Sequence, residues 1–72
     1  MTNAQSTAAF FAATDAKTSA VILANIARHY GITSGQAYAA VTDEDAEHLL
    51  DYVTGPARSA TRALMQRHGL AA

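Results

Sequence analysis

Apolar residues recur every three or four positions along most of this chain, which is the spacing of amphipathic helices. The pattern is clearest over residues 15–30, where Thr14 or Asp15 serves as an N-cap and Gly31 follows the last apolar position. A glycine there readily takes the left-handed conformation that ends helices. We therefore predict a helix over 15–30, with an inner face made of Ala20, Leu23, Ile26, Ala27 and Tyr30.

The same reasoning predicts three further helices and one short one. They span residues 34–41, 43–54, 56–68 and 8–13. The N-cap candidates are Ser6 or Thr7 for 8–13, Thr33 or Ser34 for 34–41, and Thr42 for 43–54, and Pro56 suits the first turn of the last helix. The inner faces are expected at Ala37, Ala40 and Val41, at Ala46, Leu49, Leu50 and Val53, and at Ala57, Ala60, Thr61, Leu64 and Met65. We expect Leu70 to fold back onto Met65 or Leu64.

No segment alternates β-branched and polar residues as a strand does. The predicted fold class is therefore all-α, a small compact bundle of four to five short helices with a helix-turn-helix-like corner. Residues 1–72 form a single domain, and the small polar residues of 1–7 are expected to be disordered.

The chain is short and rich in alanine, with 18 Ala among 72 residues. A domain of this size buries only about 60% of its unfolded surface, so its stability margin is thin. Alanine favours helix but adds little core volume, while it lets helices approach closely. A homodimer would enlarge such a core.

Composition excludes several classes of protein. There is no Cys, so disulfides and thiolate metal sites are ruled out. No apolar run approaches the roughly 20 residues needed to span a bilayer, and no basic residue precedes Lys17 as a secretory signal would require. Glycine-rich phosphate loops and nucleophile motifs are also missing. We expect a soluble cytoplasmic protein that is not an enzyme, with no cofactor, membrane partner or small-molecule substrate.

One stretch, IARHYGITSGQAYAAV, has a more specific spacing. Ala27 is a small residue in the first helix, Gly31 follows four positions later, and Ile32, Ala37 and Ala40 supply the later apolar positions. This spacing resembles the helix-turn-helix family of DNA-binding proteins over about residues 23–42.

The resemblance implies that the second helix enters the major groove of duplex DNA. Its base-edge candidates are Thr33, Ser34, Gln36 and Tyr38, and the phosphate candidates are Lys17 and Arg28. The predicted recognition helix carries no Arg or Lys, although these make the commonest specific contacts. A small helical protein also needs such a corner for purely structural reasons. The interpretation of residues 23–42 as a structural corner without DNA binding therefore stays open.

Charge is distributed unevenly, although the net charge is only −1. Arg58, Arg62 and Gln66 make an alternative basic stripe on the last helix, suited to phosphate or to an acidic partner. The alternative is an ordinary solvated face. Five acids cluster within residues 43–51, where capping and the helix dipole explain those at the helix start. His48 with Glu44 and Asp51 is too small a set for a tight metal site, so no metal is expected.

An apolar surface is the second binding candidate. Phe10, Phe11, Val21 and Ile22 fall outside the best-defined inner faces and are candidate partner-binding residues. The sequence thus predicts a non-enzymatic binding protein. It is either a helix-turn-helix DNA-binding or regulatory accessory protein, or a protein–protein interaction module that binds a protein partner or itself.

Overall fold

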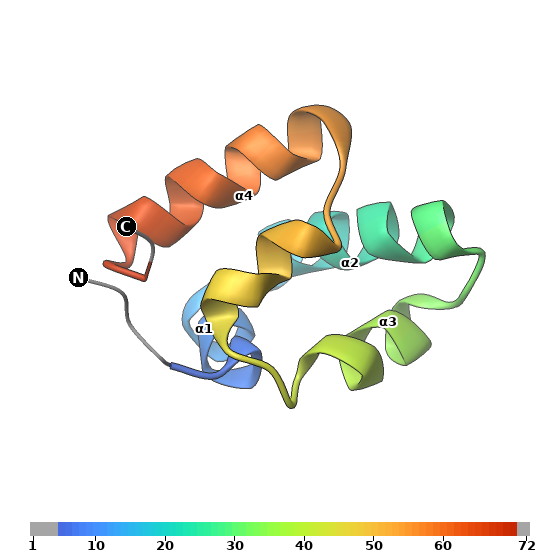
Figure 1. The fold of residues 1–72 in the computed structure, drawn as a ribbon, viewed down its shortest axis with the longest axis horizontal. Helices are drawn as coiled ribbons and strands as arrows, with labels where there is room; N and C mark the ends of the chain where they lie inside the picture. Colours follow the sequence, from blue (N-terminus) through green and yellow to red (C-terminus); the bar gives the residue numbers. More distant parts are fainter. Residues whose placement is uncertain (1–4, 71–72) are drawn as a thin grey trace.

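Helices make up almost all of the secondary structure in the computed structural model, which describes residues 5–70. The elements are α1 (Thr7–Ala13), α2 (Ala16–Tyr30), α3 (Ser34–Val41), the 3-10 helix η1 (Ala46–Asp51) and α4 (Gly55–Arg67). No strand occurs within these described residues, only one isolated antiparallel bridge between Ser6 and Asp45. The predicted all-α bundle is confirmed (Figure 1).

Side-chain caps begin the first three helices where the sequence predicted them. Ser6 caps α1, Asp15 caps α2 by accepting from the Thr18 amide at 3.0 Å, and Thr33 caps α3. The chain ends α4 in a tight turn, in which the Leu70 amide donates to the Met65 carbonyl at 2.8 Å. Leu70 is thereby buried against the core, as predicted.

The predicted helix over 43–54 is wrong in its first turn and in its type. Residues 42–45 form a turn, and only Ala46–Asp51 are helical, with 3-10 geometry. The cause is long-range pairing with the N-terminal segment. The Thr7 amide donates to the Glu44 carbonyl at 2.8 Å, and the Ala46 amide donates to the Gln5 carbonyl at 2.7 Å. These bonds hold Asp45 extended, with ψ at 145°.

The same pairing corrects the prediction that residues 1–7 are disordered. Residues 5–7 are tied to residues 44–46 by backbone hydrogen bonds, and Thr7 is fully buried. Residues 1–4 lie outside the described part of the chain. The N-terminal segment therefore contributes to the architecture by fixing α1 against η1.

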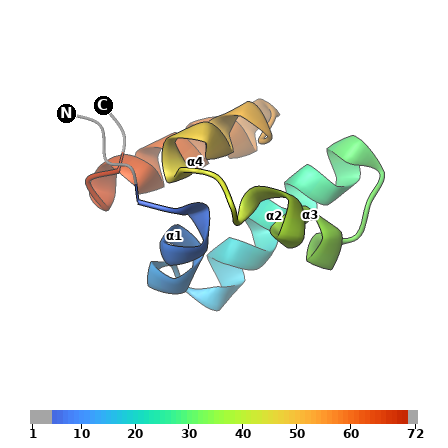
Figure 2. The ribbon, with the colours of Figure 1, turned by 60° about the horizontal axis from the view of Figure 1, so that its bottom comes forward.

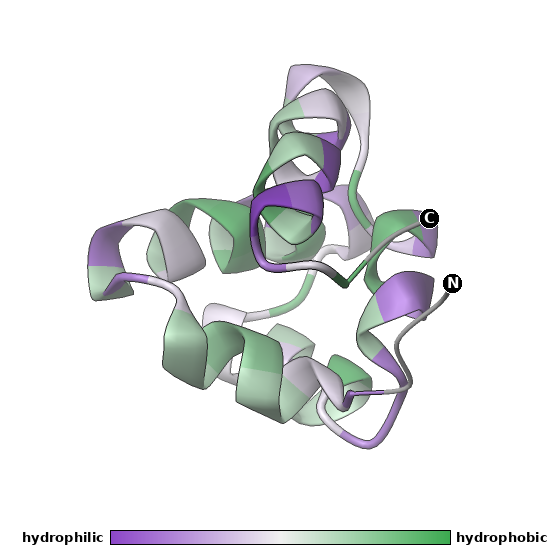
Figure 3. Cartoon of the chain, turned by 90° about the vertical axis from the view of Figure 1, so that its left-hand side faces the viewer, coloured by the Kyte–Doolittle hydropathy of each residue, from purple (hydrophilic) through white to green (hydrophobic). Residues whose placement is uncertain are grey.

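The core lies between all five helices. Its largest fully buried side chains include Phe10, Ile26, Leu49, Met65 and Leu70. Figure 2 shows η1 lying beside α4, and Leu49 of η1 and Val53, which follows η1, are buried in the core. Hydrophobic and hydrophilic segments alternate along the helices (Figure 3), as amphipathic helices around one core require.

The buried face of α2 is rotated from the predicted one. Ile22, Ile26 and Ala27 are buried, whereas Tyr30 is 50% exposed and Ala20 is exposed. Two isoleucines four positions apart form one ridge of the helix, and that ridge is what the core covers. Ala40 of α3 and Ala60 of α4, both predicted to face inward, are also exposed. A methyl group gains little from burial, so larger neighbours decide each face.

Candidate functional site: two surfaces on α2

The corner between α2 and α3 forms where the sequence placed it. Gly31 has φ of 67°, in the left-handed region, and the Ile32 amide donates to the Ala27 carbonyl at 3.0 Å. Ile32 packs on the edge of the core. The corner thus ends α2 and starts α3 with three residues between them, and it leaves the beginning of α3 exposed.

Two of the predicted base-reading residues bind each other. The Thr33 amide donates to Gln36 Oε1 at 2.9 Å, and the Gln36 amide donates to Thr33 Oγ1 at 3.1 Å. This reciprocal arrangement is a capping box, which satisfies amides at the helix start. The Gln36 side-chain carbonyl is therefore engaged, while its amide nitrogen makes no hydrogen bond within residues 5–70.

The other predicted DNA contacts are exposed but scattered. Ser34 and Arg28 flank the corner, whereas Lys17 lies eleven residues before Arg28 on α2, about 16 Å along the helix axis. The Tyr38 ring packs 5.8 Å from the Phe11 ring and is 42% exposed. The structure brings together Thr33, Ser34 and Gln36, and separates Lys17 and Tyr38 from them.

An acidic hollow follows α3 along the chain. It has a volume of about 420 Å³ and is lined by Asp43, Glu44, Asp45, His48, Asp51 and Tyr52. Within it the Tyr52 hydroxyl donates to Glu44 Oε1 at 2.8 Å. This hydrogen bond and, secondarily, burial raise the pKa of Tyr52 above its ordinary value. A surface of this charge repels nucleic acid.

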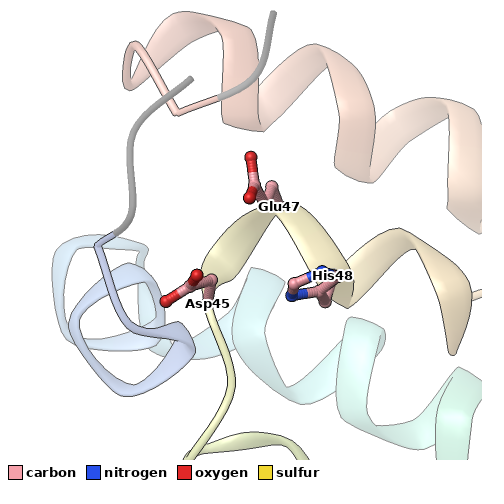
Figure 4. A group of neighbouring side chains, drawn as sticks. All are labelled: Asp45, Glu47 and His48. Atoms are coloured by element: carbon pink, nitrogen blue, oxygen red, sulfur yellow. The ribbon is translucent and has the colours of Figure 1, made fainter.

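The metal-ligating group in this region differs from the one considered from the sequence. Asp45, Glu47 and His48 place one ligand atom each within 4.8 Å of one another (Figure 4), whereas Glu44 and Asp51 do not belong to the group. The 3-10 geometry of η1 changes which side chains are neighbours, because it has three residues per turn. Three ligands from one surface turn fall short of the four that structural zinc sites use.

The basic stripe is formed as expected. Arg58, Arg62 and Gln66 are exposed along one face of α4, and with Ser59 and Ala63 they border a hollow of about 230 Å³. This face points to solvent. Its role in binding stays a prediction.

The predicted apolar partner surface is wrong in three of its four residues. Phe10 is 0% exposed, Phe11 is 7% exposed and Ile22 is 3% exposed. The two phenylalanine rings pack edge to face with centroids 5.5 Å apart, and His68 lies edge-on to Phe10 at 6.0 Å. These aromatic contacts dock α1 into the bundle, so the side chains belong to the core. Only Val21 remains on the surface, at 60% exposure.

Val21 borders a groove that sequence reasoning missed. The α2–α4 groove has a volume of about 390 Å³ and is lined by Asp15, Thr18, Val21, Ile22, Ala57, Ala60, Thr61, Ala63, Leu64 and Arg67. Apart from Thr18 and Thr61, its polar residues are Asp15 and Arg67, which lie at the start of α2 and the end of α4. The alanines at positions 57, 60 and 63 of α4 are the sequence feature that could have indicated this groove.

No family model, curated protein or solved structure gave a significant match to the chain. The helix-turn-helix resemblance therefore stays a prediction. Within residues 5–70, no helix combines the length and the apolar character that crossing a bilayer requires.

Proposed function

We propose that this chain is a non-enzymatic protein-interaction module, and that its binding surface is the α2–α4 groove. The observation that carries the proposal is Val21, the most exposed large hydrophobic residue of the described chain, at the border of an apolar hollow. A single exposed apolar residue is common on protein surfaces, whereas contiguous apolar surface marks interaction sites. Val21 is continuous with the apolar lining of the hollow, so it belongs to the second kind.

The shape of the groove favours a helix as the ligand. Ala60 and Ala63 are exposed on its α4 wall, and Leu64 is half-buried beside them. Methyl side chains leave room for another helix to approach closely, and Val21 supplies a projecting contact on the opposite wall. Binding of an amphipathic helix in an apolar groove is a recurrent mode of recognition.

The proposal is tested by selecting binders from a library of helical peptides displayed against the immobilised protein. We expect enriched peptides to carry apolar residues at helical spacing and to lose binding to Val21→Asp, which buries an unpaired carboxylate in the contact. Ala24→Asp is the matched control, because Ala24 is exposed on the same helix and lies outside the groove.

Enriched peptides that bind both variants equally well would contradict the proposal, as would a selection that enriches no peptide. Circular dichroism of both variants checks that each remains helical. The cytoplasmic compartment expected from the sequence belongs to the same proposal and is checked by cell fractionation.

A second candidate is binding of duplex DNA by the exposed start of α3. Its support is that Thr33, Ser34 and Gln36 are grouped at a helix N-terminus, where the helix dipole favours phosphate, and that Arg28 lies just before the turn. The acidic hollow after α3 opposes it.

The informative variant for this candidate is Gln36→Glu. Glutamate preserves the capping box, so the fold should keep its stability, but it removes the amide donor that pairs with adenine and adds a charge repelled by phosphate. Amide chemical-shift titration with mixed-sequence duplex at low salt is the measurement. Shifts over residues 28–36 that vanish in this variant support DNA binding, and no shifts even at low salt would exclude it.

A further inference from the structure

The α2–α4 groove carries both a projecting residue and a hollow of small residues on one face. Val21 stands on the α2 wall at 60% exposure, while Ala60 and Ala63 are exposed on the α4 wall. A surface that presents a knob and a matching hole side by side is complementary to a rotated copy of itself. Two-fold dimers are built on such self-complementary patches.

The two helices run antiparallel along the groove (Figure 1). At one end, the Thr54 amide just before α4 donates to Asn25 Oδ1 in α2 at 3.0 Å. At the other end, Asp15 before α2 and Arg67 at the end of α4 line the same groove. Opposite charges therefore lie on the two walls at one end, and the rest of the groove is lined by apolar residues and two threonines.

We infer that the partner of the groove is a second copy of this chain, bound about a two-fold axis that runs along the groove. This rotation lays α2 of each copy on α4 of the other. It places Val21 of one copy against Ala60 and Ala63 of the other, and Asp15 of one copy opposite Arg67 of the other. By symmetry, each of these three contacts forms twice.

The charges of Asp15 and Arg67 favour a second copy of the chain over an unrelated helix as the partner of the groove. A copy supplies an arginine where Asp15 lies and an aspartate where Arg67 lies, so neither charge is left unpaired at the interface. The chain carries a net charge of only −1, so two copies repel each other weakly. The Arg58, Arg62 and Gln66 stripe stays outside the contact, because the groove does not include these residues.

Sedimentation velocity of the full chain, from about 10 µM to about 1 mM, tests the dimer in the concentration range of small interfaces. We expect the sedimenting species to shift from monomer to dimer with concentration. Val21→Asp should weaken the dimer roughly a hundredfold, because each interface gains two unpaired carboxylates. Ala63→Glu on the opposite wall should act in the same direction, whereas Ala24→Asp should leave the dimer intact.

Cysteine cross-linking tests the register, since the chain has no Cys of its own. We expect an equimolar mixture of Val21→Cys and Ala63→Cys chains to form mainly the mixed disulfide on mild oxidation. A wild-type chain that stays monomeric at 1 mM, a dimer that survives both wall substitutions, or disulfides formed at random would overturn the inference. It rests on the proposed function, yet a monomeric chain that still selects helical peptides would overturn only the self-association.

Discussion

The bond between Tyr52 and Glu44 is the contact whose chemistry is easiest to isolate. It joins Tyr52, the residue that follows η1, to Glu44 in the turn that precedes η1, eight residues earlier, and both partners are partly buried. The hydroxyl donates to a carboxylate, which is a stronger acceptor than a neutral oxygen. Ionised Tyr52 would lose the proton it donates and face a like charge, and this explains the raised pKa.

Removing this hydroxyl should change how stability depends on pH. Because the Tyr52 pKa is higher in the folded protein than in the unfolded chain, its stabilisation is complete below about pH 10, the ordinary tyrosine value, and is lost as pH rises through the raised pKa. We expect Tyr52→Phe to lower the free energy of unfolding by about 1 kcal/mol at pH 7–9 and to flatten the loss above pH 10. Urea unfolding between pH 7 and 11 measures both.

Tyr38→Phe is the control, because Tyr38 is 42% exposed, its hydroxyl makes no hydrogen bond within residues 5–70, and it is not among the groups that raise the Tyr52 pKa. If Tyr52→Phe and wild type lost stability in parallel above pH 10, the hydrogen bond would not be the cause of the raised pKa.

Among the elements, the α2–α3 corner contains two glycines with different backbone conformations, left-handed at Gly31 and helical at Gly35. Gly31 has φ of 67°, and a Cβ added there would meet nothing within 4 Å. Its requirement is therefore a matter of backbone conformation alone. Gly35 lies in the first turn of α3 with helical geometry, and an added Cβ would meet only Thr33 Oγ1, at 3.9 Å.

Substitution by alanine at these two positions should change the free energy of unfolding in opposite directions. Gly31→Ala should cost about 1–2 kcal/mol, because an L-residue is forced into the left-handed region. Gly35→Ala should stabilise by about 0.5–1 kcal/mol, because alanine loses less conformational freedom in a helix. Thermal and urea unfolding measure both, and a stabilising Gly31→Ala would show that the turn is not held in this conformation.

Helix ends were predictable from the sequence where the determinants are local. Asp15, Gly31 and Thr33 act within four residues of their own position, and each is found in its predicted role. The first turn of the predicted helix 43–54 failed because its backbone pairs with residues 5–7, some forty positions earlier. Sequence periodicity carries no information about such a partner.

At the scale of the whole molecule, the same limit explains which surface was missed. Phe10, Phe11 and Ile22 fit an exposed apolar patch until the docking of α1 shows that they fill the core. The α2–α4 groove exists only once both helices are placed side by side, so neither helix reveals it alone. What the sequence does contain is the run of small residues on α4 and one valine among polar neighbours on α2.

If two copies of the chain bind each other through the α2–α4 groove and not through the corner, dilution should change the environment of the groove residues alone. An amide chemical-shift series of the labelled protein, diluted from about 1 mM to about 10 µM, measures this change. We expect shifts that change with concentration at residues 18–22 and 57–67, while those of residues 31–38 stay constant. Constant shifts along both groove helices, or changes confined to the start of α3, would show that the groove does not join two copies.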